Sequence, residues 1–213
     1  MRLYYFTSDK YGLSALEKRR LKIARLNELN DPFEFLGWNI KDRSVRAKLK
    51  AWKNERNEEL GILCFSRTWS NPLLWGHYAE KHKGVAIGFD VPARNTFKVG
   101  YRDTRLAAPS GRDLTELDVE ALLLTKFRAW SYETEQRCFC RLKHSIQENG
   151  LYFEPLSKIG TLAEVIVGDR STISRDDLAQ VLGNEFSKVK TFKARPAFGT
   201  FTVVRNRDSR LWV

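Results

Sequence analysis

The sequence predicts a single α+β domain with a mostly antiparallel sheet. Segments of helical periodicity and short β-prone runs follow one another in an irregular order, without the regular strand–helix alternation of a parallel sheet. No linker, repeat or low-complexity tract divides the 213 residues, so we expect one domain over residues 1–213. The sheet is expected to be flanked by helices and can be split into two parts.

Each element has its own local signal. Helices are expected where apolar residues recur every three or four positions: Leu13–Arg20, Asp42–Glu59, Pro72–Lys81, Leu114–Thr125 and Asp176–Leu182. Strands are expected at β-prone runs bounded by turn residues: Leu3–Thr7, Lys22–Leu26, Gly61–Ser66, Gly84–Asp90, Phe97–Tyr101, Gln136–Leu142, Leu151–Phe153, Leu162–Val167, Lys188–Ala194 and Phe201–Arg205. We expect Leu151–Phe153 to pair with Gln136–Leu142.

The charge balance is strongly basic. Thirty-seven Lys and Arg residues against 26 Asp and Glu give a formal net charge of +11. A positive field of this size attracts polyanions, so DNA or RNA bound through a basic surface is an expected partner. A solvated basic surface without a partner fits the same counts. Without a long apolar run or a secretion signal, we expect no membrane partner and a cytoplasmic location.

The three cysteines do not form a disulfide framework, and Cys64, Cys138 and Cys140 are expected to be buried, reduced thiols. Cys138 and Cys140 are two positions apart, so on a strand they share one face while Phe139 takes the other. With three histidines and no Cys-x-x-Cys, no metal site is expected. Glycine-rich phosphate-binding loops and zinc-protease motifs are also missing from the sequence.

Residues capable of chemistry concentrate in two stretches. The first, Trp75–Asp90, begins on the expected helix, which places Trp75 and Tyr78 on one face and His77 on another. His77 can contact a ligand or act as a base, and the Lys81–Lys83 cluster can meet a phosphate. A structural histidine beside a core tryptophan is the more common outcome for such a residue.

The second stretch is Trp130–Arg137. On a strand, Glu133, Glu135 and Arg137 project to one side. Two carboxylates on one face raise each other's pKa unless a cation such as Arg137 offsets the repulsion. Such a pair suits the stabilisation of a developing cation or general-base catalysis. A surface ion-pair ladder with Arg137 explains the spacing equally well.

Six ordered motifs together resemble a bacterial family, the domain-of-unknown-function family 2971. They are Tyr4–Phe6, Asn30–Glu34, Cys64–Ser66, Trp75–Ala79, His82–Val85 with Gly88–Asp90, and Trp130–Arg137. More distantly, the order of elements resembles the ADP-ribosyltransferase superfamily. In that superfamily an aromatic-His-aromatic-Thr strand comes first, a Ser- or Tyr-bearing strand follows, and a late strand begins at the catalytic Glu. Tyr4–Thr7, Cys64–Ser66 and Glu133–Glu135 match these three parts here.

The resemblance implies an ADP-ribosyltransferase-like fold and an enzyme that uses NAD to modify a nucleic-acid or protein target, as a toxin or phage-defence effector would. It implies that Glu135 stabilises the oxocarbenium-like ribose and that Glu133 assists the attacking group. The NAD-contacting residues that it implies are Tyr5, Asn30, Ser66, His77 and Tyr78. Tyr5 stands where the superfamily usually has His or Arg, and it can hydrogen-bond without supplying a charge.

Two other functions remain open from the residues alone. The first is a non-catalytic nucleic-acid-binding protein, in which the basic surface is the function and the motifs belong to the core. The second is a metal-dependent nuclease that would use Asp31, Asp90, Glu133 and Glu135. The nuclease is the least favoured, because the sequence lacks a carboxylate-x-Lys arrangement beside these residues.

Overall fold

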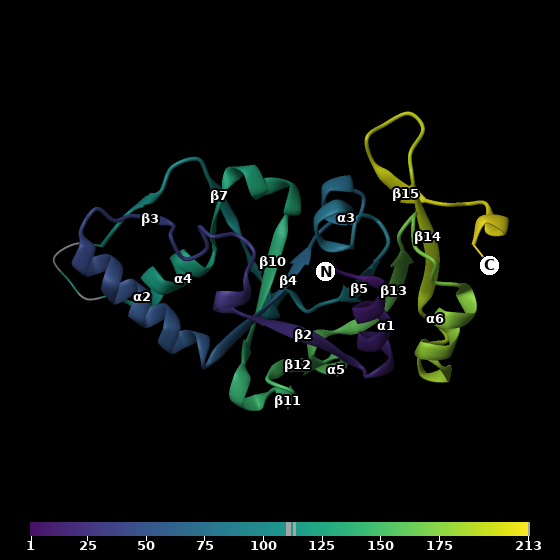
Figure 1. The fold of residues 1–213 in the computed structure, drawn as a ribbon, viewed down its shortest axis with the longest axis horizontal. Helices are drawn as coiled ribbons and strands as arrows, with labels where there is room; N and C mark the ends of the chain where they lie inside the picture. Colours follow the sequence, from purple (N-terminus) through teal and green to yellow (C-terminus); the bar gives the residue numbers. More distant parts are fainter. Residues whose placement is uncertain (110–111, 113, 213) are drawn as a thin grey trace.

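A large sheet runs through the middle of the molecule (Figure 1). In the computed structural model, which describes residues 1–109, 112 and 114–212, eleven strands join in it. The main path is β11 (Ile146–Glu148), β12 (Leu151–Pro155), β2 (Arg20–Arg25), β4 (Leu60–Ser66), β1 (Arg2–Thr7), β5 (Val85–Asp90), β13 (Thr161–Val167), β14 (Lys190–Pro196) and β15 (Val203–Arg205), with β10 (Glu135–Arg141) joining β4 to β6 (Phe97–Lys98). Neighbours are antiparallel except β13 and β14, so the predicted α+β class with a mostly antiparallel sheet is confirmed.

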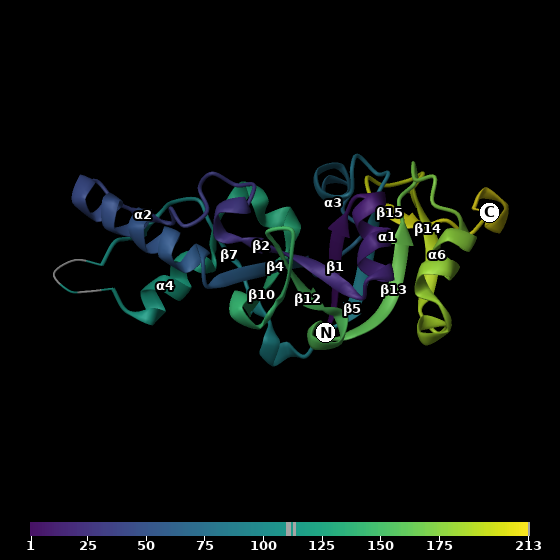
Figure 2. The same cartoon turned by 60° about the horizontal axis from the view of Figure 1, so that its bottom comes forward.

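The helices lie around this sheet: α1 (Asp9–Glu17), α2 (Arg43–Asn57), α3 (Pro72–Tyr78), α4 (Glu116–Leu123), α5 (Leu156–Ile159) and α6 (Arg175–Leu182). Figure 2 shows α2 and α4 at one end of the molecule and α1 and α6 toward the other. Two small parallel pairs lie beside the main sheet: β3 (Trp38–Asn39) with β8 (Leu106–Ala107), and β7 (Gly100–Arg102) with β9 (Thr125–Phe127). Among the described residues, no helix is long and apolar enough to cross a membrane.

Side-chain caps explain where the helices begin. Ser8 Oγ accepts a hydrogen bond from the Tyr11 amide, so α1 begins at Asp9, before the predicted Leu13. Asp42 caps α2 in the same way and confirms the predicted start. Asn71 caps α3 just before Pro72, whose fixed φ suits the first helical position.

The expected helix Leu13–Arg20 ends at Glu17, and Arg20 begins β2 instead. Three further expectations about the elements were wrong. Helix α3 ends at Tyr78 instead of Lys81, because Glu80, Lys81 and His82 all have left-handed φ angles of 48°, 56° and 71°. The expected strand Phe97–Tyr101 is two strands, because β6 pairs with β10 whereas β7 pairs with β9. The expected pairing of Leu151–Phe153 with Gln136–Leu142 does not occur. β12 pairs instead with β11 and β2, and both edges of β10 are taken by β4 and β6.

The sheet splits along one edge of β4. Strand β2 pairs with the first part of that edge, at Gly61 and Ile62, and β1 pairs only with its last residue, Ser66. The backbone of residues 63–65 therefore has no strand on that side, while β10 covers the whole of the opposite edge. This divergence of β1 from β2 opens space in the middle of the sheet.

Apolar side chains fill both faces of the sheet on either side of this split. Cys138 and Cys140 face the core beneath α1 and α6, and Phe139 faces the core beneath α2 and α4, as the spacing predicts. All three cysteines are free thiols, but only Cys140 is buried as expected, whereas Cys64 and Cys138 are half-buried. Gly84 is required for close packing, because a Cβ there would lie 2.0 Å from the Thr7 carbonyl oxygen.

Candidate functional site

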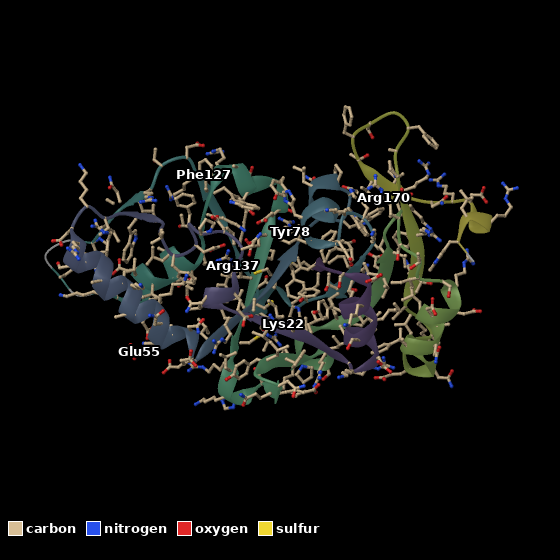
Figure 3. The ribbon with its side chains drawn as sticks, in the orientation of Figure 1. Lys22, Glu55, Tyr78, Phe127, Arg137 and Arg170 are labelled. Carbon is tan, nitrogen blue, oxygen red and sulfur yellow. The ribbon has the colours of Figure 1, made fainter. Side chains whose placement is uncertain are left out.

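A cavity of about 280 Å³ lies where β1 and β2 diverge from β4. Its wall combines residues from the three strands with residues from the segment after β2, from α3 and from the approach to β10. The lining residues are Tyr4, Tyr5, Phe6, Lys22, Ala24, Glu28, Leu29, Asn30, Glu34, Ile62, Cys64, Phe65, Ser66, Leu74, Tyr78, Lys126, Glu133 and Glu135. Figure 3 labels Lys22 and Tyr78 in this wall and Arg137 beside it.

Six of the seven residues singled out from the sequence line this one cavity. They are Tyr5, Asn30, Ser66, Tyr78, Glu133 and Glu135. His77 is the exception: it is exposed, is not part of the wall, and its Nδ1 lies 2.6 Å from the Tyr132 hydroxyl. It belongs to an aromatic group outside the cavity, with Trp130 and Tyr132.

Three neighbouring strands, β1, β4 and β10, align the polar residues of the wall. Ser66 on β4 lies opposite Tyr4 on β1 and opposite Glu135 on β10. The Tyr5 hydroxyl lies across the split, 3.4 Å from the Lys22 carbonyl oxygen that accepts its hydrogen bond. Burial raises the pKa of Tyr5 to about 12, so this residue presents a neutral hydroxyl to the cavity.

Glu133 and Glu135 reach the cavity by a different route from the one predicted. Glu133 is the last residue of a 3₁₀ helix, Arg128–Glu133, and does not belong to the strand. Thr134 then takes a left-handed conformation with φ 44°, and β10 begins at Glu135. The two carboxylates face the same space because of this turn. The prediction that Glu133 and Glu135 lie on one strand and project to the same side was therefore wrong.

The carboxylates belong to a buried cluster of five charged residues, here called the charge cluster: Glu34, Lys126, Glu133, Glu135 and Arg137. The Arg137 side chain is fully buried and holds two carboxylates at once. Its Nε and Nη2 donate to Glu135 at 2.8 and 3.1 Å, and its Nη2 and Nη1 donate to Glu34 at 2.6 and 3.1 Å. Such two-pronged pairs fix the carboxylates in one geometry.

Lys126 joins the rest of the charge cluster from β9. Its Nζ lies 2.6 Å from Glu133 Oε2, 3.3 Å from Glu135 Oε2 and 3.6 Å from Glu34 Oε1. Sequence reasoning missed Lys126 and gave Glu34 no role. The available signal was a lysine close after the apolar run Leu122–Leu124, a position where an unpaired buried charge would be costly.

The surroundings move the pKa values of the two central carboxylates apart. Burial acts to raise the pKa of Glu135, but Arg137 and Lys126 outweigh it and lower the pKa to about 2. Burial raises the pKa of Glu133, and Lys126 and Tyr78 offset only part of this rise. Glu135 is therefore held as an anion, whereas Glu133 is the one of the two carboxylates that takes up a proton more readily.

Tyr78 connects the charge cluster to the mouth of the cavity. Its hydroxyl donates to Glu133 Oε1 and accepts a hydrogen bond from Asn30 Nδ2 at 3.1 Å. Burial and the neighbouring Glu133 raise the pKa of Tyr78, so the phenol stays protonated. At the rim, Lys22 and Glu28 form an exposed ion pair at 2.7 Å.

The four acidic residues of the nuclease hypothesis do not form one group. Asp90 lies on β5, with β4 and β1 between it and β10, and pairs with Arg2 at 2.9 Å. Asp31 accepts a hydrogen bond from the Phe33 amide and is not in the cavity wall. Within the part of the chain that the structure describes, no set of three His, Cys, Asp or Glu residues is placed to hold a metal ion.

Comparison with known proteins adds no relative. No protein-family model, no curated protein and no solved structure matches the chain. The interpretation of the site therefore depends on its own geometry.

Proposed function

We propose that this protein is an ADP-ribosyltransferase-like enzyme that takes NAD as its substrate in the split-sheet cavity. One observation supports this above all: Tyr5, Ser66 and Glu135 lie on three adjacent strands and line a single cavity. The volume of the cavity matches part of an NAD molecule. Small-molecule sites typically measure roughly 300–1,000 Å³, and at about 280 Å³ the cavity would take the nicotinamide and its ribose, with the rest of the dinucleotide outside.

In the proposed reaction, the bond between nicotinamide N1 and ribose C1′ breaks and its electron pair leaves with neutral nicotinamide. The ribose becomes a cation, and the fixed anion Glu135 stabilises it from a buried position. Arg137 and Lys126 take three of the roughly four acceptor positions of the Glu135 carboxylate. The Cys64 thiol, a weak donor, lies beside this carboxylate, so a ribose hydroxyl can take the remaining acceptor position.

Glu133 then serves as the general base. The acceptor nucleophile attacks C1′ and loses its proton to this carboxylate, whose raised pKa suits the exchange. Tyr78 and Lys126 hold the two oxygens of Glu133 in place. The aromatic group of exposed His77 and half-buried Trp130 and Tyr132 lies next to Tyr78 and forms the surface that an incoming acceptor would meet.

The test combines titration calorimetry with NAD and measurement of nicotinamide release, with single-stranded DNA or RNA and cellular protein offered as acceptors. We expect Glu135→Gln to lower nicotinamide release about 100-fold or more, as the loss of a charge-stabilising group does. Glu133→Gln should slow transfer and remove the acidic limb of the pH–rate profile. Glu59→Gln, the same change in an exposed pair with Arg56, is the matched control.

Tyr78→Phe gives a milder probe of the same wall, with Tyr11→Phe on exposed α1 as its control. The Phe variant keeps the ring and removes the hydroxyl that touches Glu133. If the folded wild-type protein neither binds NAD nor releases nicotinamide with any of these acceptors, the proposal fails.

A further inference from the structure

The loop between β14 and β15 exposes two phenylalanines. Phe198 is 95% exposed and Phe201 is fully exposed, the two most exposed large apolar side chains of the described residues. Hydrogen bonds hold the loop in one conformation. The Ala197 amide donates to the Thr202 carbonyl at 2.9 Å, the Thr200 and Thr202 hydroxyls lie 2.7 Å apart, and the Val203 amide donates to Ser70 at 2.7 Å. The rings are therefore presented on a fixed support, and Figure 3 shows ring side chains projecting from this loop.

The strands that support this loop are strongly basic. Residues 188–210 contain seven Lys or Arg and one acidic residue, Asp208. In the described part of the chain, Arg210 is the one member of the seven that pairs with a carboxylate. Lys193 and Arg195 donate only to backbone carbonyls, so their positive charge is not neutralised. Figure 3 shows blue nitrogen atoms gathered around β14 and β15, near the labelled Arg170.

Cations and aromatic rings alternate over this surface. Arg195 lies over the Phe198 ring at 4.4 Å, Arg205 over Phe192 at 5.1 Å, and Arg175 over Trp212 at 5.0 Å. A groove of about 700 Å³ continues from β15 along this surface, and its lining holds four cations, Arg175, Lys193, Arg205 and Arg207, against two carboxylates, Asp176 and Asp208. An excess of positive charge thus lines the groove, and Arg195 brings a further cation to the tip of the loop.

We propose that this surface, the β14–β15 hairpin with its groove, binds single-stranded nucleic acid. A single strand offers one negative charge per nucleotide and a flat ring that is free to stack, and binding sites for it combine a basic groove with exposed aromatic rings. Phe201 and the face of Phe198 opposite Arg195 are available for stacking at the tip, and Lys193, Arg205 and Arg207 supply charge along the groove. An anionic membrane is the less favoured partner, because insertion would use the tip and leave the groove without a role.

The proposal does not depend on the NAD reaction. The hairpin shares no residue with the wall of the split-sheet cavity, although Ser70 connects it to the segment just before α3, which carries Tyr78. If the single-stranded nucleic acid were also the acceptor of the NAD reaction, the hairpin would extend the acceptor site beyond the cavity. Either proposal can fail while the other stands.

The test is fluorescence anisotropy of the full chain with a labelled 20-nucleotide strand, as DNA and as RNA, over a range of salt concentrations. We expect the double variant F198A/F201A to weaken binding about 10-fold or more, since each stacked base contributes strongly to affinity. The slope of log affinity against log salt should stay unchanged, because no cation is lost. Tyr11→Ala, an exposed aromatic on α1, is the matched control and should bind like the wild type.

The double variant R195Q/R205Q should change the slope instead. Loss of two phosphate contacts lowers its magnitude by about 1.4 for a single strand. R43Q/R46Q on exposed α2 removes the same charge elsewhere and should leave the slope nearly unchanged.

Three results would overturn the proposal. One is the absence of binding to either labelled strand. Another is equal binding to the strand and to its duplex with no effect of F198A/F201A. The third is binding to vesicles of neutral and anionic phospholipid that F198A/F201A abolishes, while the labelled strand is not bound.

Discussion

The charge cluster buries charged residues in ion pairs, whereas the β14–β15 hairpin exposes cations that have no carboxylate partner among the described residues. In the charge cluster, three carboxylates and two cations are buried and every one of them has an ionic partner. On the hairpin, cations without carboxylate partners stand beside two phenylalanine rings in solvent. Neither arrangement is what stability favours, because burying ions and exposing large apolar rings are both unfavourable. The first keeps its groups in one geometry and the second leaves its groups free for a partner.

The largest expected effect comes from removing the centre of the charge cluster. Arg137→Met leaves Glu34 and Glu135 buried with fewer partners, and breaking such a pair costs about 3–5 kcal/mol. Urea unfolding measures the loss. Arg205→Met on the hairpin is the comparison and should stay within about 0.5 kcal/mol of the wild type. Similar losses in both variants would contradict the distinction between the two regions.

The pH dependence of stability should show two opposite contributions from the charge cluster. Glu135 has its folded pKa lowered from 4.5 to about 2, so its contribution, up to roughly 3 kcal/mol, is present above pH 4.5 and is lost as the pH falls toward 2. Glu133 has a raised pKa, so its protonation favours the folded state as the pH falls toward 4.5. We expect a stability maximum in mild acid, measured by urea midpoints at several pH values. F198A/F201A should leave the shape of this curve unchanged.

The two carboxylates should also differ when each is made neutral. The partners of Glu135, Arg137 and Lys126, can only donate hydrogen bonds, so a Gln amide there leaves donors facing each other. At Glu133 the Tyr78 hydroxyl can turn and accept from the amide. Glu135→Gln should therefore be less stable than Glu133→Gln by about 1–3 kcal/mol in urea unfolding. If the two variants were equally stable, the hydrogen-bond partners of Glu133 and Glu135 would not differ in the way described.

The smallest effect is expected from salt on the folded protein. Exposed charges are screened within about 8–10 Å in ordinary buffer, so added salt should relieve repulsion among the hairpin cations and stabilise the wild type by a few tenths of a kcal/mol. R195Q/R205Q should reduce this gain, and thermal melts at low and high salt measure it. If R195Q/R205Q kept the full salt-induced gain in stability, the repulsion that salt relieves would lie outside the hairpin.

The sequence predicts most strands of the sheet because these depend on local patterns. The strands that bear Tyr5, Ser66 and Glu135 are confirmed within two residues, whereas Tyr5 and Ser66 were singled out as site residues by resemblance to a known superfamily. Two kinds of feature lay beyond local pattern. Glu34 meets Lys126 and Arg137 only when distant segments come together, and Lys126 meets Glu133 and Glu135 only through the turn between β9 and β10. The left-handed conformation of Thr134, a residue with a β-branched side chain, is imposed by its surroundings, so the spacing of Glu133 and Glu135 suggested a strand instead.

The location of the cavity at a split in the sheet has a consequence for how the chain folds during synthesis. Its wall draws on β1 near the start of the chain and on β10 beyond residue 134, with β4 between them. Contacts between such distant positions form late, because a long loop must first be closed. A chain that has emerged only as far as α4 has Glu34 without either cation that neutralises it. The pocket and its chemistry can therefore appear only after β10 has joined β4.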